Sequence, residues 1–257
     1  AARSEWNAAL LSRVVAPAYA RLVIAAAAKL GPTPAFYALL PRVTPPPPWG
    51  SVVAQLYAQL SDVKILHTPA GGGRWITPKE AVYPDHELAT NTQLAEALVA
   101  EGLFVTDAPT AVLERLEEHA VKDPERVSPH GVRRLLRSAD RVAAAKRGRP
   151  RERVLTLLRY CLSDVIDDDP ASAAELEGVP LAPLADGTAG MIQPGGVGAQ
   201  PIYVPSAEET PLLGRATDLC VDRTADKELT ARLETLAGTG ALNLKRVDAD
   251  ALAALMP

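Results

Sequence analysis

Apolar side chains recur at helical spacing near the start of the chain. Residues 5–30 predict one long helix that ends at Gly31-Pro32, because glycine suits a C-terminal cap and proline stops a helix. Pro17 predicts a kink within this helix, or its division into two shorter helices. The apolar positions form one stripe, which consists of Leu10, Leu11, Val14, Val15, Tyr19, Leu22 and Val23.

Further helices follow the same periodicity. The clearest runs from Pro150 to about residue 165, where apolar residues follow i, i+4, i+7, i+8 and i+11. Ser128-Pro129 predicts a helix N-cap with proline at the first helical position. The other predicted helices span residues 34–40, 51–60, 90–100, 110–120, 128–139 and 224–237, with a last one capped by Asp248 or Asp250.

Residues 64–85 predict the most specific local structure of the chain, a β-hairpin. The run from Val63 to His67 is apolar and partly β-branched, and Trp75-Ile76 restarts an extended run. Gly71-Gly72-Gly73 lies between them and can take the positive φ values of a tight reversal. A second, looser hairpin is predicted between residues 179–184 and 191–193, and further strands at 103–106, 202–204, 219–221 and 242–247.

Helices interleaved with short β-hairpins favour an α+β fold over a doubly wound sheet, which would need regular strand–helix alternation. The two hairpins predict two sub-domains with a boundary between residues 120 and 128. Residues 1–122 are expected to hold a helical segment and the first hairpin, and residues 123–257 a helical pair and the second hairpin. Because only 4% of residues are aromatic, Ala, Leu and Val are expected to fill the core.

The apolar pattern also bears on location. The longest uninterrupted apolar stretch, Leu22 to Ala28, is far shorter than the roughly 20 residues that span a bilayer, so no transmembrane helix and no membrane partner are expected. No secretory signal is visible, and the helical start without Met predicts that the chain belongs to a longer polypeptide. Low cysteine usage indicates a reducing, cytoplasmic setting with Cys161 and Cys220 as buried free thiols.

Charge is distributed unevenly, although the whole chain carries a net charge of −4. Residues 122–153 carry +7 and residues 154–257 carry −9, so the basic block can face an acidic partner in the same chain or in another molecule. Nucleic acid is disfavoured, because no aromatic residue between Val121 and Leu158 is placed to stack on bases. The candidate partner surface consists of Arg133, Arg134, Arg137, Arg141, Arg147 and Arg149.

Several motifs resemble ligand sites but lack an essential part. Asp186-Gly187-Thr188-Ala189-Gly190 is similar to a nucleotide box of GHKL-type ATPases, yet Thr188 stands at the position of the first glycine. The stretch Gly195–Gly198 lacks the Lys and the Ser or Thr of a phosphate loop. The acidic run 167–169 lacks the glycine and closing glutamate of an EF-hand, and the four histidines are scattered. We therefore predict no catalytic residue, no cofactor and no metal site.

Four segments resemble the sacsin repeat region and occur in the same order. They are Trp6-Asn7 with the run from Leu10 to Tyr19, Phe36–Pro41, Gly73–Ile76 with Glu80–Asp85, and Val179–Gly187. The resemblance implies a very large co-chaperone-like protein, in which this chain follows a GHKL-type ATPase-like module. The glutamate, asparagine and glycine boxes that contact ATP in that module have no counterpart here, so no catalytic residue carries over.

Two classes of functional hypothesis follow. The preferred one is a non-enzymatic scaffold or client-binding segment in protein quality control, with protein clients, chaperones or neighbouring domains of the same chain as partners. The alternative is part of an ATP-dependent chaperone module whose nucleotide site is completed by neighbouring sequence. A nucleic-acid-binding module is the weaker alternative.

Overall fold

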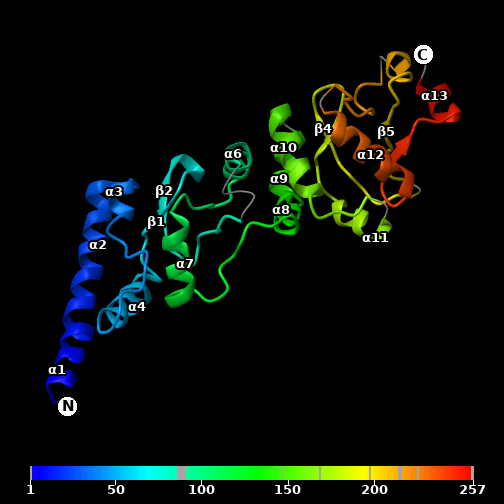
Figure 1. Ribbon diagram of the computed structural model, residues 1–257. Coiled ribbons are helices and arrows are strands. Elements are labelled where there is room, and N and C mark those ends of the chain that lie inside the picture. The colour runs from blue at the N-terminus through cyan, green and yellow to red at the C-terminus, as the bar shows by residue number, and fades with distance from the viewer. Residues whose placement is uncertain are drawn as a thin grey trace. The chain divides into compact units, whose positions relative to one another are not determined.

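A computed structural model describes residues 2–85, 91–146, 148–167, 169–196, 198–213, 216–224 and 226–255 (Figure 1). Helices make up about 49% and strands about 11% of the structure, and each described sheet has two strands, which confirms the α+β class. The chain divides into two compact units. Unit 1 comprises residues 1–91 and 98–127, and unit 2 comprises residues 92–97 and 128–257.

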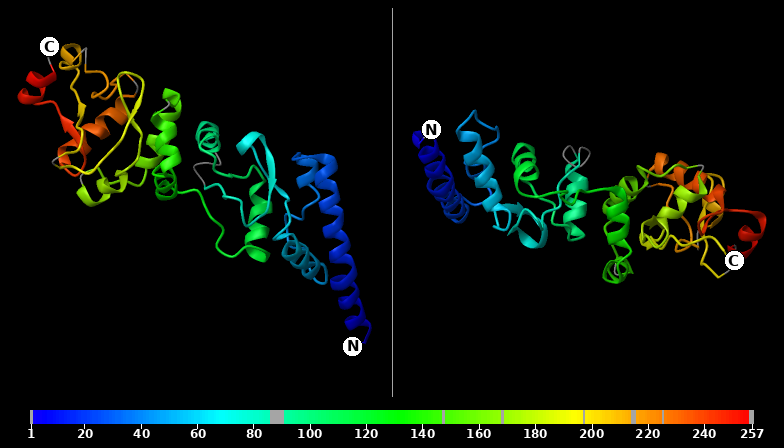
Figure 2. Two further views of the ribbon diagram at one scale, coloured as in Figure 1. Left: turned by 180° about the vertical axis from the view of Figure 1, so that it is seen from behind. Right: turned by 90° about the horizontal axis from the view of Figure 1, so that it is seen from below.

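Unit 1 contains a long N-terminal helical rod, a second helix beside it and a small hairpin (Figure 1, Figure 2). Helix α6 (Thr92–Ala100) is shared, because its first six residues belong to unit 2. The other elements are α1 (Ala2–Leu10), a π-helical turn (Leu11–Val15), α2 (Ala16–Leu30), α3 (Pro34–Tyr37), α4 (Trp49–Leu60), β1 (Leu66–Thr68), a 3-10 turn (Ala70–Gly72), β2 (Arg74–Ile76) and α7 (Thr110–His119).

The N-terminal rod is helical throughout its described length. A π-helical turn precedes Pro17, and its last bond runs from the N–H of Ala16 to the carbonyl of Leu11, five residues back. The predicted break at Pro17 is thus replaced by a wider turn just before it. The rod ends at Gly31, whose φ of +64° is the conformation expected of a C-terminal glycine, as predicted.

The first hairpin has the predicted order of strand, glycine turn and strand. Leu66 pairs with Ile76 and His67 with Trp75 in an antiparallel ladder. Gly72 and Gly73 have φ values of +88° and +87°, which a residue with a side chain adopts only under strain. The core of unit 1 packs against this hairpin, and its fully buried members include Phe36, Leu56, Tyr57, Leu60, Ile65, Leu66 and Ile76.

Unit 2 combines a set of helices with short strands (Figure 2). In chain order its elements are α8 (Pro129–Leu136), α9 (Ala139–Lys146), α10 (Arg151–Leu162), α11 (Pro170–Ala173), a 3-10 turn (Ala174–Leu176), β3 (Ala182–Pro183), β4 (Ala189–Gly190), β5 (Ile202–Val204), a 3-10 turn (Thr210–Leu213), α12 (Lys227–Thr239), β6 (Leu244–Arg246) and α13 (Ala249–Leu255). Ser128 caps α8 as predicted, since its Oγ accepts the N–H of Gly131 at 3.1 Å.

The second hairpin is shorter than predicted. Strand β3 pairs with β4, and residues 191–193 lie outside any strand. Pro183 has no N–H to donate, which limits the ladder. Ile192 nevertheless donates its N–H to the carbonyl of Val179 at 3.0 Å, so the two predicted segments do lie side by side.

The remaining strand predictions hold in part. Strands β5 and β6 are present and pair in parallel, with Ile202 opposite Leu244. Residues 219–221 and 103–106 form only isolated bridges to their neighbours. Both cysteines are free and buried, as predicted.

Candidate functional site

The basic block is only partly buried, and Arg133 is one of its residues that point into unit 2. The side chain of Arg133 is 3% exposed, and its guanidinium donates to both carboxylate oxygens of Asp164 and to the carbonyl of Cys161. A carboxylate of Glu175 lies 3.6 Å from the same guanidinium. The prediction that Arg133 contributes to a partner surface is therefore wrong, because burying an arginine requires partners within the fold, and Asp164 supplies the charge.

The other members of the predicted partner surface have mixed positions. Arg137 is half-buried and donates its Nε–H to the carbonyl of Glu177 at 2.6 Å. Arg149 is also buried, with its Nη1 3.3 Å from the carbonyl of Pro180, so its assignment to the surface is wrong as well. Arg134 is exposed. The side chain of Arg141 and all of Arg147 lie outside the described part of the chain.

The two ligand-like glycine motifs have structural roles. Asp186 closes the turn of the second hairpin, where its Oδ1 accepts the N–H of Thr188 at 2.8 Å. A Cβ on Gly195 would lie 2.3 Å from the carbonyl oxygen of Gly240, so this glycine is required by close backbone packing. In the acidic loop, Asp167 pairs with Arg232 at 2.6 Å. Among the described residues, no three His, Cys, Asp or Glu side chains are grouped to hold a metal ion.

His67 takes part in a polar cluster that sequence reasoning missed. Its Nδ1 lies 2.8 Å from Oδ2 of Asp107, and the Tyr37 hydroxyl donates to the other carboxylate oxygen at 3.4 Å. The backbone N–H of His67 donates in turn to the Tyr37 hydroxyl. Burial raises the pKa of Tyr37, and the neighbouring Asp107 charge raises it further. Since these three residues lie up to 70 positions apart, only folding brings them together, and their bonds fasten β1 to α3 and to the segment before α7.

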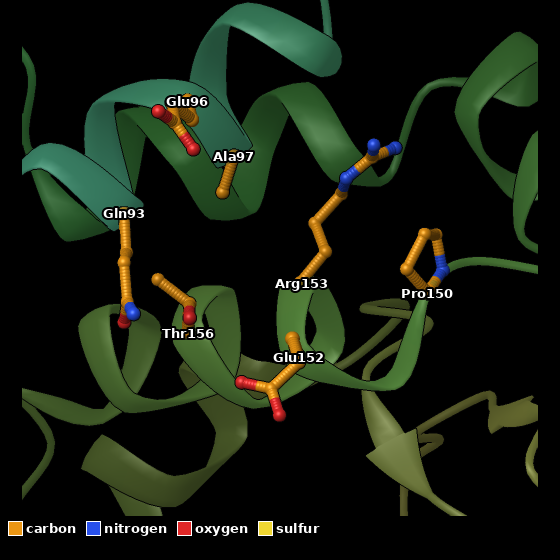
Figure 3. A pocket seen from close by; sticks show the side chains of 7 residues that line it. All are labelled: Gln93, Glu96, Ala97, Pro150, Glu152, Arg153 and Thr156. Carbon is orange, nitrogen blue, oxygen red and sulfur yellow. The ribbon is translucent and has the colours of Figure 1, made fainter.

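A shallow pocket lies between α6 and α10 within unit 2 and has a volume of about 280 Å³ (Figure 3). Its wall is formed by Gln93, Glu96, Ala97, Pro150, Glu152, Arg153 and Thr156. Figure 3 shows the carboxylate of Glu152 and the guanidinium of Arg153 pointing away from each other. The charged groups therefore do not converge on one point, as a binding site for a small polar ligand would require.

The N-terminal rod carries an exposed row of apolar side chains. Trp6, Leu10, Val14, Ala18 and Leu22 follow one another at intervals of four residues, and all five are exposed. Trp6 is 64%, Val14 53% and Leu22 57% exposed. We call this row the outer stripe. Large apolar side chains in regular array on a surface are a feature of interaction sites.

The opposite side of the same rod packs against α4. Its buried residues are Ala16, Ala20, Val23 and Ala27. The single apolar stripe predicted from the sequence is therefore wrong, since neighbours on a helix lie about 100° apart and the predicted stripe is divided between two sides. Leu10, Val14 and Leu22 face outward, whereas Val23 is buried and Leu11, Val15 and Tyr19 are half-buried.

The rod also corrects the prediction about membrane-spanning helices. Residues 5–30 form a helix that is long and apolar enough to cross a membrane by length and composition. The prediction counted only uninterrupted apolar residues and so gave too much weight to single charges such as Arg21. In unit 1 the rod is held in the fold, because the Tyr19 hydroxyl donates to the carbonyl of Leu39 at 2.6 Å and α2 packs on α4.

Comparisons with known proteins give no family assignment. No family model matches the chain, and no match was found among curated proteins or solved structures.

Proposed function

We propose that this chain is a non-enzymatic scaffold segment that holds protein clients, as part of a large sacsin-like co-chaperone in the cytoplasm. The observation that carries the proposal is the outer stripe of the N-terminal rod. A protein that retains partly unfolded chains has to offer apolar area to them, because such chains expose apolar side chains of their own.

The exposed apolar side chains are concentrated in unit 1, which carries the outer stripe. Of the nine large hydrophobic residues that are most exposed in the described structure, eight belong to residues 6–49 of unit 1. Ile166 alone belongs to unit 2. From Leu11 to Leu30 the opposite side of the rod packs on α4, so this part of the outer stripe lies on a helix that is already ordered before a client binds.

Suppression of client aggregation by the full chain tests this proposal. A thermally unfolded client protein should scatter less light when the chain is present in excess. The triple variant Leu10→Gln, Val14→Gln, Leu22→Gln should lose this effect, because glutamine keeps the helix but removes the apolar surface. Ile166→Gln is the control, since it changes an apolar residue of unit 2 that is at least as exposed and should leave the suppression intact. Equal suppression by all three proteins would refute the role of the outer stripe.

The two other hypotheses from the sequence have their own tests. Micromolar ATP binding by this chain in calorimetry would favour the ATP-dependent alternative over a scaffold. Salt-sensitive binding of an oligonucleotide, weakened by Arg134→Gln, would favour the nucleic-acid alternative, because Arg134 is an exposed member of the basic block.

A further inference from the structure

The outer stripe lies in a part of the chain that has no acidic residue. No Asp or Glu occurs between residues 6 and 61, whereas this stretch contains Arg13, Arg21, Lys29 and Arg42. All four side chains are exposed. Among the described residues, none of the four forms an ion pair, although many other arginines of the chain do so. Glu5, next to Trp6, is the acidic residue of the rod, so the charge along the stripe from Leu10 to Leu22 is positive.

Two of these cations directly border the stripe. Arg13 lies three residues after Leu10 and Arg21 three residues after Ala18, and residues three apart are neighbours on a helix surface, so each basic side chain lies beside a stripe residue. The Nε of Arg21 lies 3.4 Å from the carbonyl of Pro17, one turn back along the same helix. Arginine and lysine side chains can lay their methylene groups along apolar surface and keep the charged ends at its edge.

This charge pattern discriminates between occupants. Parallel pairing of the stripe with a second copy of itself, in register, would bring cations against cations, which costs energy at short range. An apolar segment with basic flanks would meet the same repulsion. An apolar segment with acidic flanks would bury its apolar residues on the stripe and place its carboxylates beside Arg13 and Arg21.

We infer that the outer stripe selects acidic apolar segments of its clients, meaning stretches in which large apolar residues are flanked by Asp or Glu. This inference rests on the proposed function, because it names the class of client that the same surface holds. The apolar contact supplies most of the binding free energy. The cations determine which client segments bind, and they make binding depend on salt concentration.

The test uses the full chain and two labelled peptides with identical apolar residues, one with glutamate flanks and one with lysine flanks. Fluorescence anisotropy at low salt should show the glutamate peptide binding at least about tenfold more tightly than the lysine peptide. The triple variant Arg13→Gln, Arg21→Gln, Lys29→Gln should abolish this difference and leave the apolar stripe in place. High salt should reduce the difference in the same way.

The outcomes separate the inference from the proposed function. If both peptides bind equally and the Leu10, Val14 and Leu22 variant binds neither, clients are held but charge selection is refuted. If neither peptide binds, the proposed function itself fails. Tighter binding to anionic phosphatidylserine vesicles than to the glutamate peptide, lost in the same charge variant, would overturn the inference in favour of a membrane surface. Dimerisation that is lost in the stripe variant would overturn it in favour of self-association.

Discussion

The guanidinium of Arg133 lies 2.5 Å from Oδ1 and 3.1 Å from Oδ2 of Asp164, although 31 positions separate the two residues in the chain. Arg133 is on α8 and Asp164 follows α10, so this bidentate ion pair links two helices of unit 2. The arginine is buried, whereas 43% of the aspartate side chain is exposed. Asp164 therefore compensates the buried charge of Arg133, and its own carboxylate stays in contact with water.

Removing the charge of Asp164 should destabilise the protein. Asp164→Asn leaves the Arg133 charge buried with only the more distant Glu175 carboxylate nearby, and we expect a loss of about 2 kcal/mol in the free energy of unfolding. Urea denaturation measures the change. Asp62→Asn is the control, because the Asp62–Lys79 pair is exposed on both sides and should leave the urea midpoint unchanged. Equal midpoints for both variants would show that the buried pair is dispensable.

Phe36 and Trp75 pack against each other beside the first hairpin, and replacing each by alanine should lower the free energy of unfolding by a different amount. Phe36 is fully buried, and its ring centroid lies 5.2 Å from that of Trp75 in an edge-on contact. Phe36→Ala should cost about 3–5 kcal/mol, as expected of a buried aromatic residue. Trp75 is only half-buried, so Trp75→Ala should cost less, about 2 kcal/mol. Chemical denaturation followed by circular dichroism compares the two, and a larger loss at Trp75 would contradict this account.

Asp226 should contribute to stability in a pH-dependent way. A hydrogen bond from Arg159, with further bonds from the backbone N–H groups of Leu229 and Glu228, holds the pKa of Asp226 below its ordinary value of 3.8. Because the folded pKa is lower than the unfolded one, the stabilisation is present above about pH 4 and disappears as the pH falls through the folded value. Asp226→Asn should be less stable than the native protein by about 1 kcal/mol at neutral pH, with the gap closing in acid.

Urea denaturation curves at a series of pH values measure this gap. The asparagine variant keeps an oxygen that can cap α12, so the experiment isolates the charge from the cap. A gap of constant size from neutral to acid pH would mean that the charge of Asp226 contributes nothing.

The two thiols should be unreactive in the native protein. Burial raises the pKa of Cys161 to about 12, and it also raises the pKa of Cys220, so little thiolate is present at neutral pH. Iodoacetamide should label neither residue within the time that it labels both in urea, as read by mass spectrometry. Rapid labelling of Cys161 without denaturant would show that α10 opens locally.

Local chemistry allowed much of the fold to be predicted. Glycines at 72 and 73 predict a reversal because other residues avoid their φ values, and Ser128 before Pro129 predicts a helix start because its hydroxyl can cap the first turn. Each of these signals lies within a few residues of the structure that it determines. The corresponding elements were found where the sequence placed them.

The candidate sites depended on contacts between distant residues, and there the sequence was less informative. The basic residues of α8 predict a charged surface, but the sequence does not show that Asp164 would draw Arg133 inward. Likewise, the rod contains three pairs of adjacent apolar residues, Leu10-Leu11, Val14-Val15 and Leu22-Val23. Only the position of α4 decides which member of each pair is covered. The interval of four residues in the outer stripe was the available signal, because it recurs from Trp6 to Leu22 without interruption.

The π-helical turn at Leu11–Val15 sets the angular phase between the two ends of the N-terminal rod. This wide turn holds one residue more than an α-helical turn, so deleting one residue there, such as Ser12, would return the rod to regular α-helix and leave Trp6 and Leu10 in nearly the same direction relative to Leu22. Regular α-helix with every residue of the turn kept would instead rotate Trp6 and Leu10 by about 100° relative to Leu22 and divide the row into two patches on different sides. The wide turn is thus the feature that keeps both halves of the row on one side of the rod.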